Sequence, residues 1–150
     1  MTAYRRLLGV FAVIALAVGC NRGAKPVVVT GPPSPPGWEV RYNATVALAR
    51  RGSDKVKEEH VWDNLVEMLD EEQQFRNFRR PLKDKTEVTD EAKAWLTIIT
   101  ALQAVDELHR RRPELDLSGL NPSVEKLTHS RNMAVSTEAK KTQQLLAAAK

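Results

Sequence analysis

The sequence contains few of the residues that form active sites, metal sites and disulfide bonds. Its 150 residues include one cysteine, three histidines and 5% aromatic side chains. A single cysteine excludes an internal disulfide and a cysteine metal cluster. His60, His109 and His129 lie far apart and form no paired-histidine metal motif. With no nucleophile elbow and no phosphate-binding glycine loop either, the sequence predicts a protein that is not an enzyme and has no metal, cofactor or small-molecule substrate.

A long hydrophobic run is also lacking. The longest apolar stretch, Leu7 to Val18, has about a dozen residues, whereas a transmembrane helix needs about 20. Arg5 and Arg6 precede it, and the small residues Ala17 to Gly19 stand at its end, just ahead of Cys20. This order is typical of a cleaved signal peptide, so we assign residues 1–19 to one.

The only cysteine stands directly after this segment. The letters Leu16-Ala17-Val18-Gly19-Cys20 resemble the lipobox of bacterial lipoproteins, although the family usually has leucine where Ala17 stands. The resemblance implies that a diacylglycerol is attached to Cys20 and that the chain is cut just before it. Each buried CH₂ of such a lipid contributes about 0.8 kcal/mol of membrane affinity. The alternative is an ordinary secretory signal that ends near a buried cysteine.

The lipobox resemblance implies a location as well. A lipoprotein of this kind is anchored in the bacterial cell envelope and faces the periplasm, with the membrane as a partner through its N-terminal lipid. In some bacteria an aspartate after the cysteine signals retention in the inner membrane. Here that residue is Asn21, which favours the outer membrane.

Residues 20–37 have the composition of a tether. Five of the eight prolines fall in this stretch. Proline has no N–H group and fixes φ, so the segment is expected neither to continue a helix nor to enter a sheet. We predict a disordered Pro/Gly-rich spacer. The alternative, a proline-rich ligand for a partner domain, needs a repeated recognition pattern, and the chain offers only two overlapping Pro-x-x-Pro matches within residues 32–36.

The chain also lacks a strong net charge. It has 23 lysines and arginines and 19 acidic residues, and Arg5 and Arg6 belong to the predicted signal peptide. The remainder is therefore only about +2, which is weak support for nucleic-acid binding. We expect no nucleic-acid partner.

Residues 38–150 show helical periodicity and no convincing strand alternation. Apolar residues spaced i, i+3, i+4 and i+7 predict five helices and an all-α domain. The first four stripes are Val40-Ala44-Ala47-Leu48, Val61-Leu65-Met68-Leu69, Trp95-Ile98-Ile99-Leu102-Val105-Leu108 and Val124-Leu127, and the fifth is Val135-Ala139-Leu145-Leu146. Gly52 and Ser53 predict a stop and a new start between the first two helices. Residues 73–89 are predicted to be a long link.

The first of these helices resembles the second helix of a short HEAT-type repeat. Val40-Arg41, Ala44, Ala47-Leu48 and Gly52-Ser53-Asp54 follow the order of that motif. Residues 63–72 resemble the first helix of a next unit, and residues 94–102 and 135–146 resemble further second helices. The resemblance implies a small right-handed stack of helical hairpins, an α-solenoid, over residues 38–150. The alternative is a plain helical bundle.

Residues 73–85 hold the candidate contact site. Aromatic and basic side chains alternate there, as Phe75, Arg76, Phe78, Arg79 and Arg80. Such a surface suits anionic lipid headgroups or an acidic protein. The alternative is a solvated loop whose two phenylalanines cap the core.

HEAT-like stacks present extended surfaces to partners. The sequence therefore predicts a lipid-anchored, non-catalytic interaction or scaffold module with a protein partner. Two alternatives are an accessory subunit of an envelope enzyme, since some short HEAT-type repeats resemble those of phycobilin lyases, and a purely structural envelope lipoprotein.

Overall fold

The structure, a computed structural model, describes residues 37–83 and 86–148. The predicted signal peptide, Cys20 and the predicted tether lie outside the described residues. Within them the chain forms six α-helices, two short 3₁₀ helices and one hairpin. In order these are α1 (Trp38–Arg50), η1 (Asp54–Lys57), α2 (Glu59–Met68), α3 (Glu71–Asn77), β1 (Arg79–Pro81), β2 (Glu87–Thr89), α4 (Glu91–Arg111), η2 (Ser118–Leu120), α5 (Asn121–Leu127) and α6 (Met133–Ala147).

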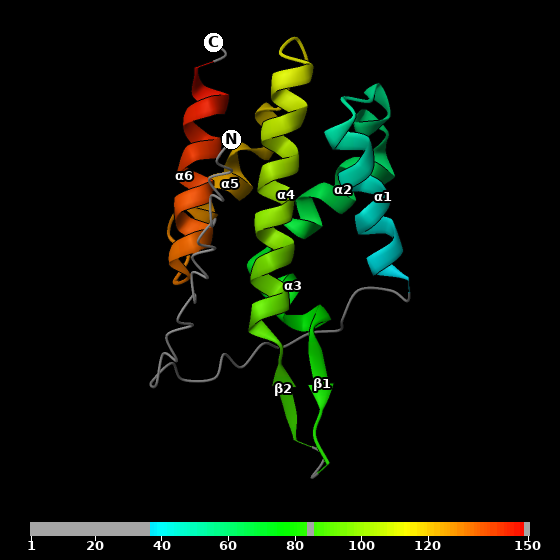
Figure 1. The fold of residues 1–150 in the computed structure, drawn as a ribbon, viewed down its shortest axis with the longest axis vertical. Helices are drawn as coiled ribbons and strands as arrows, with labels where there is room; N and C mark the ends of the chain where they lie inside the picture. The colour runs from blue at the N-terminus through cyan, green and yellow to red at the C-terminus, as the bar shows by residue number, and fades with distance from the viewer. Residues whose placement is uncertain (1–36, 84–85, 149–150) are drawn as a thin grey trace, which may run out of the picture.

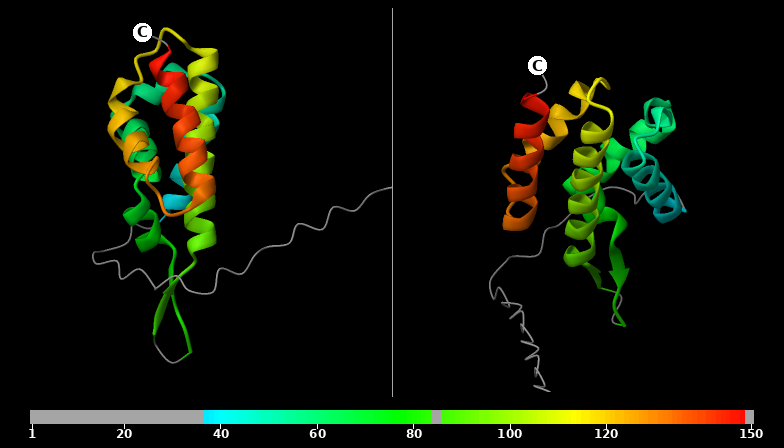
Figure 2. Two further views of the ribbon diagram at one scale, coloured as in Figure 1. Left: turned by 90° about the vertical axis from the view of Figure 1, so that its left-hand side faces the viewer. Right: turned by 45° about the horizontal axis from the view of Figure 1, so that its top comes forward.

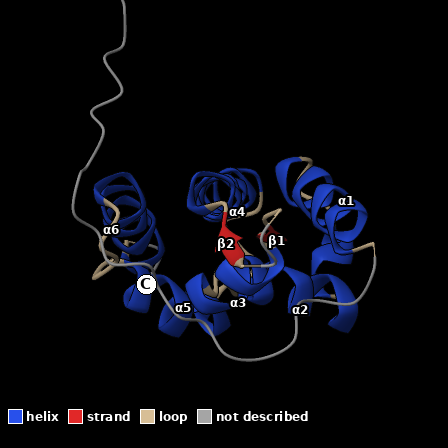
Figure 3. Ribbon diagram, turned by 90° about the horizontal axis from the view of Figure 1, so that it is seen from below, coloured by secondary structure: helices blue, strands red, loops and turns tan. Residues whose placement is uncertain are grey.

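The helices form two layers. Helices α1, α4 and α6 lie side by side in one layer, and α2, α3 and α5 lie in the other (Figure 3). All three helices of the first layer run in the same direction, away from the hairpin (Figure 1). Helix α4 is central: it packs against α1 on one flank and α6 on the other, and it contacts α3 in the second layer. The β1–β2 hairpin extends beyond the helices at one end (Figure 2).

The core lies between the layers and follows the predicted stripes of α2, α4 and α6. These helices bury apolar residues at helical spacing, so the periodicity had identified the correct faces. The largest side chains with almost no exposure include Leu65, Met68, Leu69, Ile98, Leu102, Leu108, Leu120 and Leu127. A second, smaller cluster around Phe75 and Ala94 continues the core toward the hairpin.

Three of the four residues on the predicted buried face of α1 are exposed, and only Leu48 packs, partly buried, against the core. Val40 is 73% exposed, and Ala44 and Ala47 are exposed as well. The helix instead buries Tyr42 and the positions three, four and seven residues after it, which are Thr45, Val46 and Ala49. Both sets have helical spacing, so the periodicity could not separate them. The Tyr42 hydroxyl helps to determine which face is buried, because it lies 3.1 Å from Gln74 Nε2 and 3.0 Å from Asn77 Nδ2 of α3.

The prediction of a long link over residues 73–89 is also wrong, as is that of a domain without strands. Asp70 caps α3 by accepting a hydrogen bond from the backbone N–H of Gln73 at 3.0 Å. Strands β1 and β2 then pair antiparallel, with Arg80 opposite Val88. Strands of three residues are too short to show an alternating pattern. The domain is mostly helical with a small hairpin, and the part that the structure describes has six α-helices rather than the predicted five.

The turn predicted at Gly52 is present. Gly52 has φ +68°, and Ser53 Oγ accepts a hydrogen bond from Lys55 N at 3.3 Å. That cap opens η1, so α2 starts later than predicted, at Glu59.

Replacing Gly52 with alanine is expected to destabilise the fold by about 1 to 3 kcal/mol. A left-handed φ is unfavourable for alanine, and the added Cβ would lie 2.9 Å from Arg111 Cβ. Gly37→Ala is the matched control, because Gly37 has φ +83° with no atom within 4 Å of the added Cβ. Thermal unfolding of both variants checks this. An equal loss at the two positions would mean that the contact with Arg111 adds nothing.

Candidate functional site

The two phenylalanines of the predicted contact site belong to the body of the domain. Phe75 is 3% exposed and meets Trp95 edge to face, with the ring centroids 6.1 Å apart. The guanidinium carbon of Arg131 lies 5.4 Å from the Phe75 centroid and covers the cluster. Phe78 is partly buried and meets Trp38 edge to face at 4.9 Å. This placement agrees with the alternative in which both rings cap the core.

The arginines of that site point to different partners. Arg76 Nε and Nη2 donate to Gln73 Oε1 at 2.9 and 2.6 Å. Arg79 lies 3.8 Å from a carboxylate oxygen of Glu87 across the hairpin. Arg80 is exposed on β1. The structure therefore does not bring the five predicted residues together as one aromatic and basic surface.

A different surface gathers apolar and charged side chains in one place. It is the solvent-facing side of α4 together with the facing sides of α1 and α6, and we name it the α4 trough. Along α4 its residues are spaced three or four apart, which places them on one stripe of the helix: Leu96, Thr100, Gln103, Glu107 and Arg110. The trough has an apolar hollow at one end and a charged hollow at the other.

The apolar hollow lies between the N-terminal halves of α1 and α4. Its volume is about 270 Å³, and its walls are mainly apolar: Trp38, Glu39, Tyr42, Asn43, Val46, Met68, Phe78, Leu96, Thr97 and Thr100. Leu96 is 64% exposed at its edge. Of the five residues predicted to make contacts, Phe78 alone reaches the hollow.

The charged hollow lies over the C-terminal half of α4, between α1 and α6. It measures about 460 Å³ and is lined by Arg50, Gln103, Glu107, Arg110, Arg111, Glu138 and Lys141. Four cations thus face two carboxylates.

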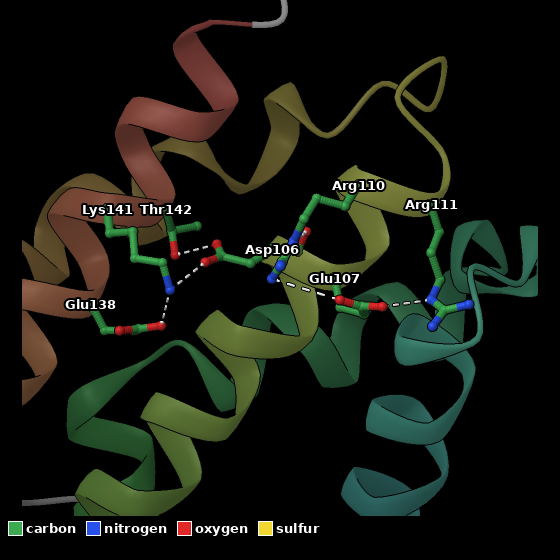
Figure 4. A network of polar contacts seen from close by, with 7 residues as sticks. All are labelled: Asp106, Glu107, Arg110, Arg111, Glu138, Lys141 and Thr142. Atoms are coloured by element: carbon green, nitrogen blue, oxygen red, sulfur yellow. Dashed lines mark hydrogen bonds and ion pairs between the residues drawn. The ribbon is translucent and has the colours of Figure 1, made fainter.

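A polar network holds α6 to α4 beneath this hollow (Figure 4). Asp106 is 2% exposed, and its carboxylate accepts a 2.6 Å hydrogen bond from Thr142 Oγ1 and lies 3.1 Å from Lys141 Nζ. Lys141 also pairs with Glu138 at 2.8 Å. The hydrogen bonds to Glu138 and then to Asp106 raise the pKa of Lys141 above its usual value. The ammonium is therefore charged throughout the physiological pH range.

Arginines from two distant parts of the chain meet at the same end of the trough. Arg112 Nη1 donates to the carbonyl oxygen of Gly52 at 3.1 Å, which joins the end of α4 to the end of α1. Glu107 pairs with Arg111 at 2.7 Å and with Arg110 at 3.6 Å (Figure 4). Arg50 and Arg51 lie across this junction, both exposed.

Two features of the sequence point to this surface, although the apolar spacing does not include them. Leu96 is a large apolar residue outside the predicted stripe of its helix. Two arginine runs, 50–51 and 110–112, each close a helix. That these runs are neighbours follows only from the parallel packing of α1 and α4.

The described residues offer no evident metal centre. The histidines lie on α2, on α4 and in the turn after α5, and no cluster of three or more metal-ligating side chains occurs in residues 37–83 and 86–148. Within the same ranges, no helix has the length and hydropathy that crossing a bilayer requires.

Comparison with models of known families, with curated proteins and with solved structures found no match to this chain.

Proposed function

We propose that this chain is a lipid-anchored protein of the bacterial cell envelope whose helical domain is a non-catalytic protein-binding module. The observation that carries the anchor is the run Leu16 to Cys20, a lipobox-like sequence that ends in the only cysteine of the chain. The observation that supports binding is the α4 trough, which combines an exposed leucine, an apolar hollow and a cluster of arginines.

We further propose that the domain is a short HEAT-like stack. Its two-layer arrangement supports this, because the three segments that resemble second helices, α1, α4 and α6, are the three parallel helices of one layer (Figure 3). The motif positions Val40, Ala44 and Ala47 do not enter the core. In the described residues α1 is an outer helix of its layer, and one flank of an outer helix has no neighbour in a stack. The exposure of these positions is therefore compatible with the proposed arrangement.

The anchor is tested by Cys20→Ser in a bacterium supplied with radioactive palmitate. The wild-type chain is expected to take up label and to sediment with membranes, since two or three acyl chains hold a domain at a bilayer. The variant should take up no label and leave the membrane fraction. Ser34→Ala, in the segment between Cys20 and α1, is the control and should behave as the wild type. Label that persists in Cys20→Ser would refute the assignment.

The binding role is tested on solubilised membranes of the producing cells. Affinity purification of the full chain should recover one protein in constant stoichiometry. Repeated purifications that recover no such protein would refute the binding role. The palmitate result is independent of this outcome, so anchor and binding are judged separately.

A further inference from the structure

We infer that the α4 trough binds an acidic amphipathic segment of a partner protein, with a bulky apolar side chain in the apolar hollow and carboxylates at the arginine end. The inference rests on the proposed protein-binding role and names the chemistry of its partner. It involves no contact by Phe75, which is buried in the core.

The two hollows follow each other along α4, because Thr100 lines the apolar hollow and Gln103, about one turn further on, lines the charged one. The stripe on α4 runs from Leu96 to Arg110, and the residues of α1 that line the hollows run in parallel from Trp38 to Arg50. Arg110 lies fourteen positions after Leu96, and a rise of about 1.5 Å per position gives a length of about 21 Å. A helical segment of about four turns, or about six extended residues, would fill it.

The apolar end has the size and composition of an anchor pocket. A volume of about 270 Å³ accommodates one large side chain, and aromatic walls from Trp38, Tyr42 and Phe78 suit a Leu, Phe or Trp. Leu96, 64% exposed at the edge, would be covered by the same partner. Single exposed apolar residues are ordinary on protein surfaces, so the argument depends on Leu96 bordering a hollow that is itself apolar.

The other end is complementary to carboxylates. Four cations line the charged hollow against Glu107 and Glu138, and the third carboxylate, Asp106, is buried and already paired. Arg50 has no ion-pair partner among the described residues. The negative ends of α1 and α4 offset part of this charge, by the equivalent of about half a charge each. Once Asp106 is counted with its partner Lys141, these charges nearly cancel. The attraction for anions therefore rests on Arg50 and on the adjacent Arg51, which is exposed and likewise forms no ion pair within residues 37–83 and 86–148. Arginine pairs with carboxylates in bidentate geometry.

The direction of the partner follows from the same residues. Glu39 is on the wall of the apolar hollow, so a carboxylate there would be repelled. The partner's apolar anchor and its carboxylates are therefore expected to be separated by three to four helical turns. A bilayer surface fits less well, because the apolar lining is recessed between two helices and needs a side chain that enters it.

The test uses the full-length chain in detergent and fluorescent synthetic peptides. Each peptide has 18 residues, with tryptophan near one end and glutamates about 11 to 14 positions away, in both orders. A second set carries lysine in place of each glutamate. Fluorescence anisotropy measures binding, and a soluble short-chain phosphatidylglycerol is added as a competitor.

Two pairs of variants locate the binding. Leu96→Asp and Arg50→Glu are each expected to weaken the glutamate peptides at least about tenfold. Leu82→Asp, an exposed leucine on the hairpin side, and Lys126→Glu, in the last turn of α5 as Arg50 is in the last turn of α1, should leave binding unchanged. Thermal unfolding of all four verifies that they are folded.

Three patterns of peptide binding would overturn the inference. They are equal binding of the glutamate and lysine peptides, equal loss in the trough and control variants, and displacement of the glutamate peptides by the phospholipid. Absence of peptide binding also overturns it. A partner protein recovered from membranes would still support the proposed function, so a failure of this inference can be distinguished from a failure of the proposed function.

Discussion

Replacing Leu102 with alanine is expected to lower the free energy of unfolding by about 3 kcal/mol, within a range of about 2 to 5 kcal/mol. Leu102 has no exposed surface and lies near the middle of α4, the helix that packs against both neighbours in its layer and against α3. The truncation leaves a cavity that rigid helices on several sides cannot close. Denaturant unfolding of the full chain, followed by far-ultraviolet circular dichroism, measures the loss.

The matched control is the same substitution six residues earlier. Leu96 is 64% exposed on the same helix, so Leu96→Ala removes little buried surface and is expected to change the free energy of unfolding by less than about 0.5 kcal/mol. Similar losses at both positions would contradict the assignment of Leu102 to the core and of Leu96 to the trough.

Asp106→Ala is expected to cost about 2 to 3 kcal/mol, which is large for a polar residue. The substitution leaves the buried Thr142 hydroxyl without its acceptor and takes one of two anionic partners from Lys141. The ammonium is itself mostly exposed, so the effect should lie below that of breaking a fully buried ion pair. Denaturant unfolding again measures the free energy of unfolding. The raised pKa of Lys141 contributes stability that is lost as the pH rises above the usual pKa of lysine, and this loss should be smaller in Asp106→Ala, where one cause of the raised pKa is gone.

Two further variants separate the buried bond from surface charge. Glu107→Ala removes the neighbouring carboxylate, whose ion pairs with Arg110 and Arg111 face solvent, and should cost less than about 1 kcal/mol. Asp106→Ala combined with Thr142→Ala should cost less than the sum of the two single changes, because each removes the same bond. Strict additivity would show that the 2.6 Å contact contributes nothing to stability.

The helices predicted correctly are those with one dominant apolar stripe. In α2 and α4 the large residues Leu65, Met68, Ile98 and Leu102 fall on a single face, so hydrophobic burial dictates the orientation. In α1 the apolar residues are spread around the helix, so no single stripe dominates. Its orientation depends in part on Tyr42, whose hydroxyl lies within hydrogen-bond distance of Gln74 and Asn77 of the folded neighbour α3.

The hairpin and the α4 trough were not predicted from the sequence, for related reasons. Strands β1 and β2 are held to each other by backbone hydrogen bonds, which leave little trace in side-chain pattern over three residues. The interleaved phenylalanines and arginines of residues 75–80 formed a local pattern and were therefore visible, yet their rings pack inward. The α4 trough combines residues from three helices, and their proximity is a property of the packing alone.

The direction of α1 has a mechanical consequence. Helix α1 begins at Trp38, next to the apolar end of the trough, and finishes at the arginine junction with α4. If the chain is anchored at its N-terminal side and a partner binds the arginine end, a pulling force between the two acts along the axis of α1. The contacts between α1 and α4 would then be loaded together in shear rather than peeled apart one turn at a time. A domain built in this way resists a pull through many contacts at once, which would suit the proposed chain, anchored at its N-terminal side and bound by a partner at the arginine end.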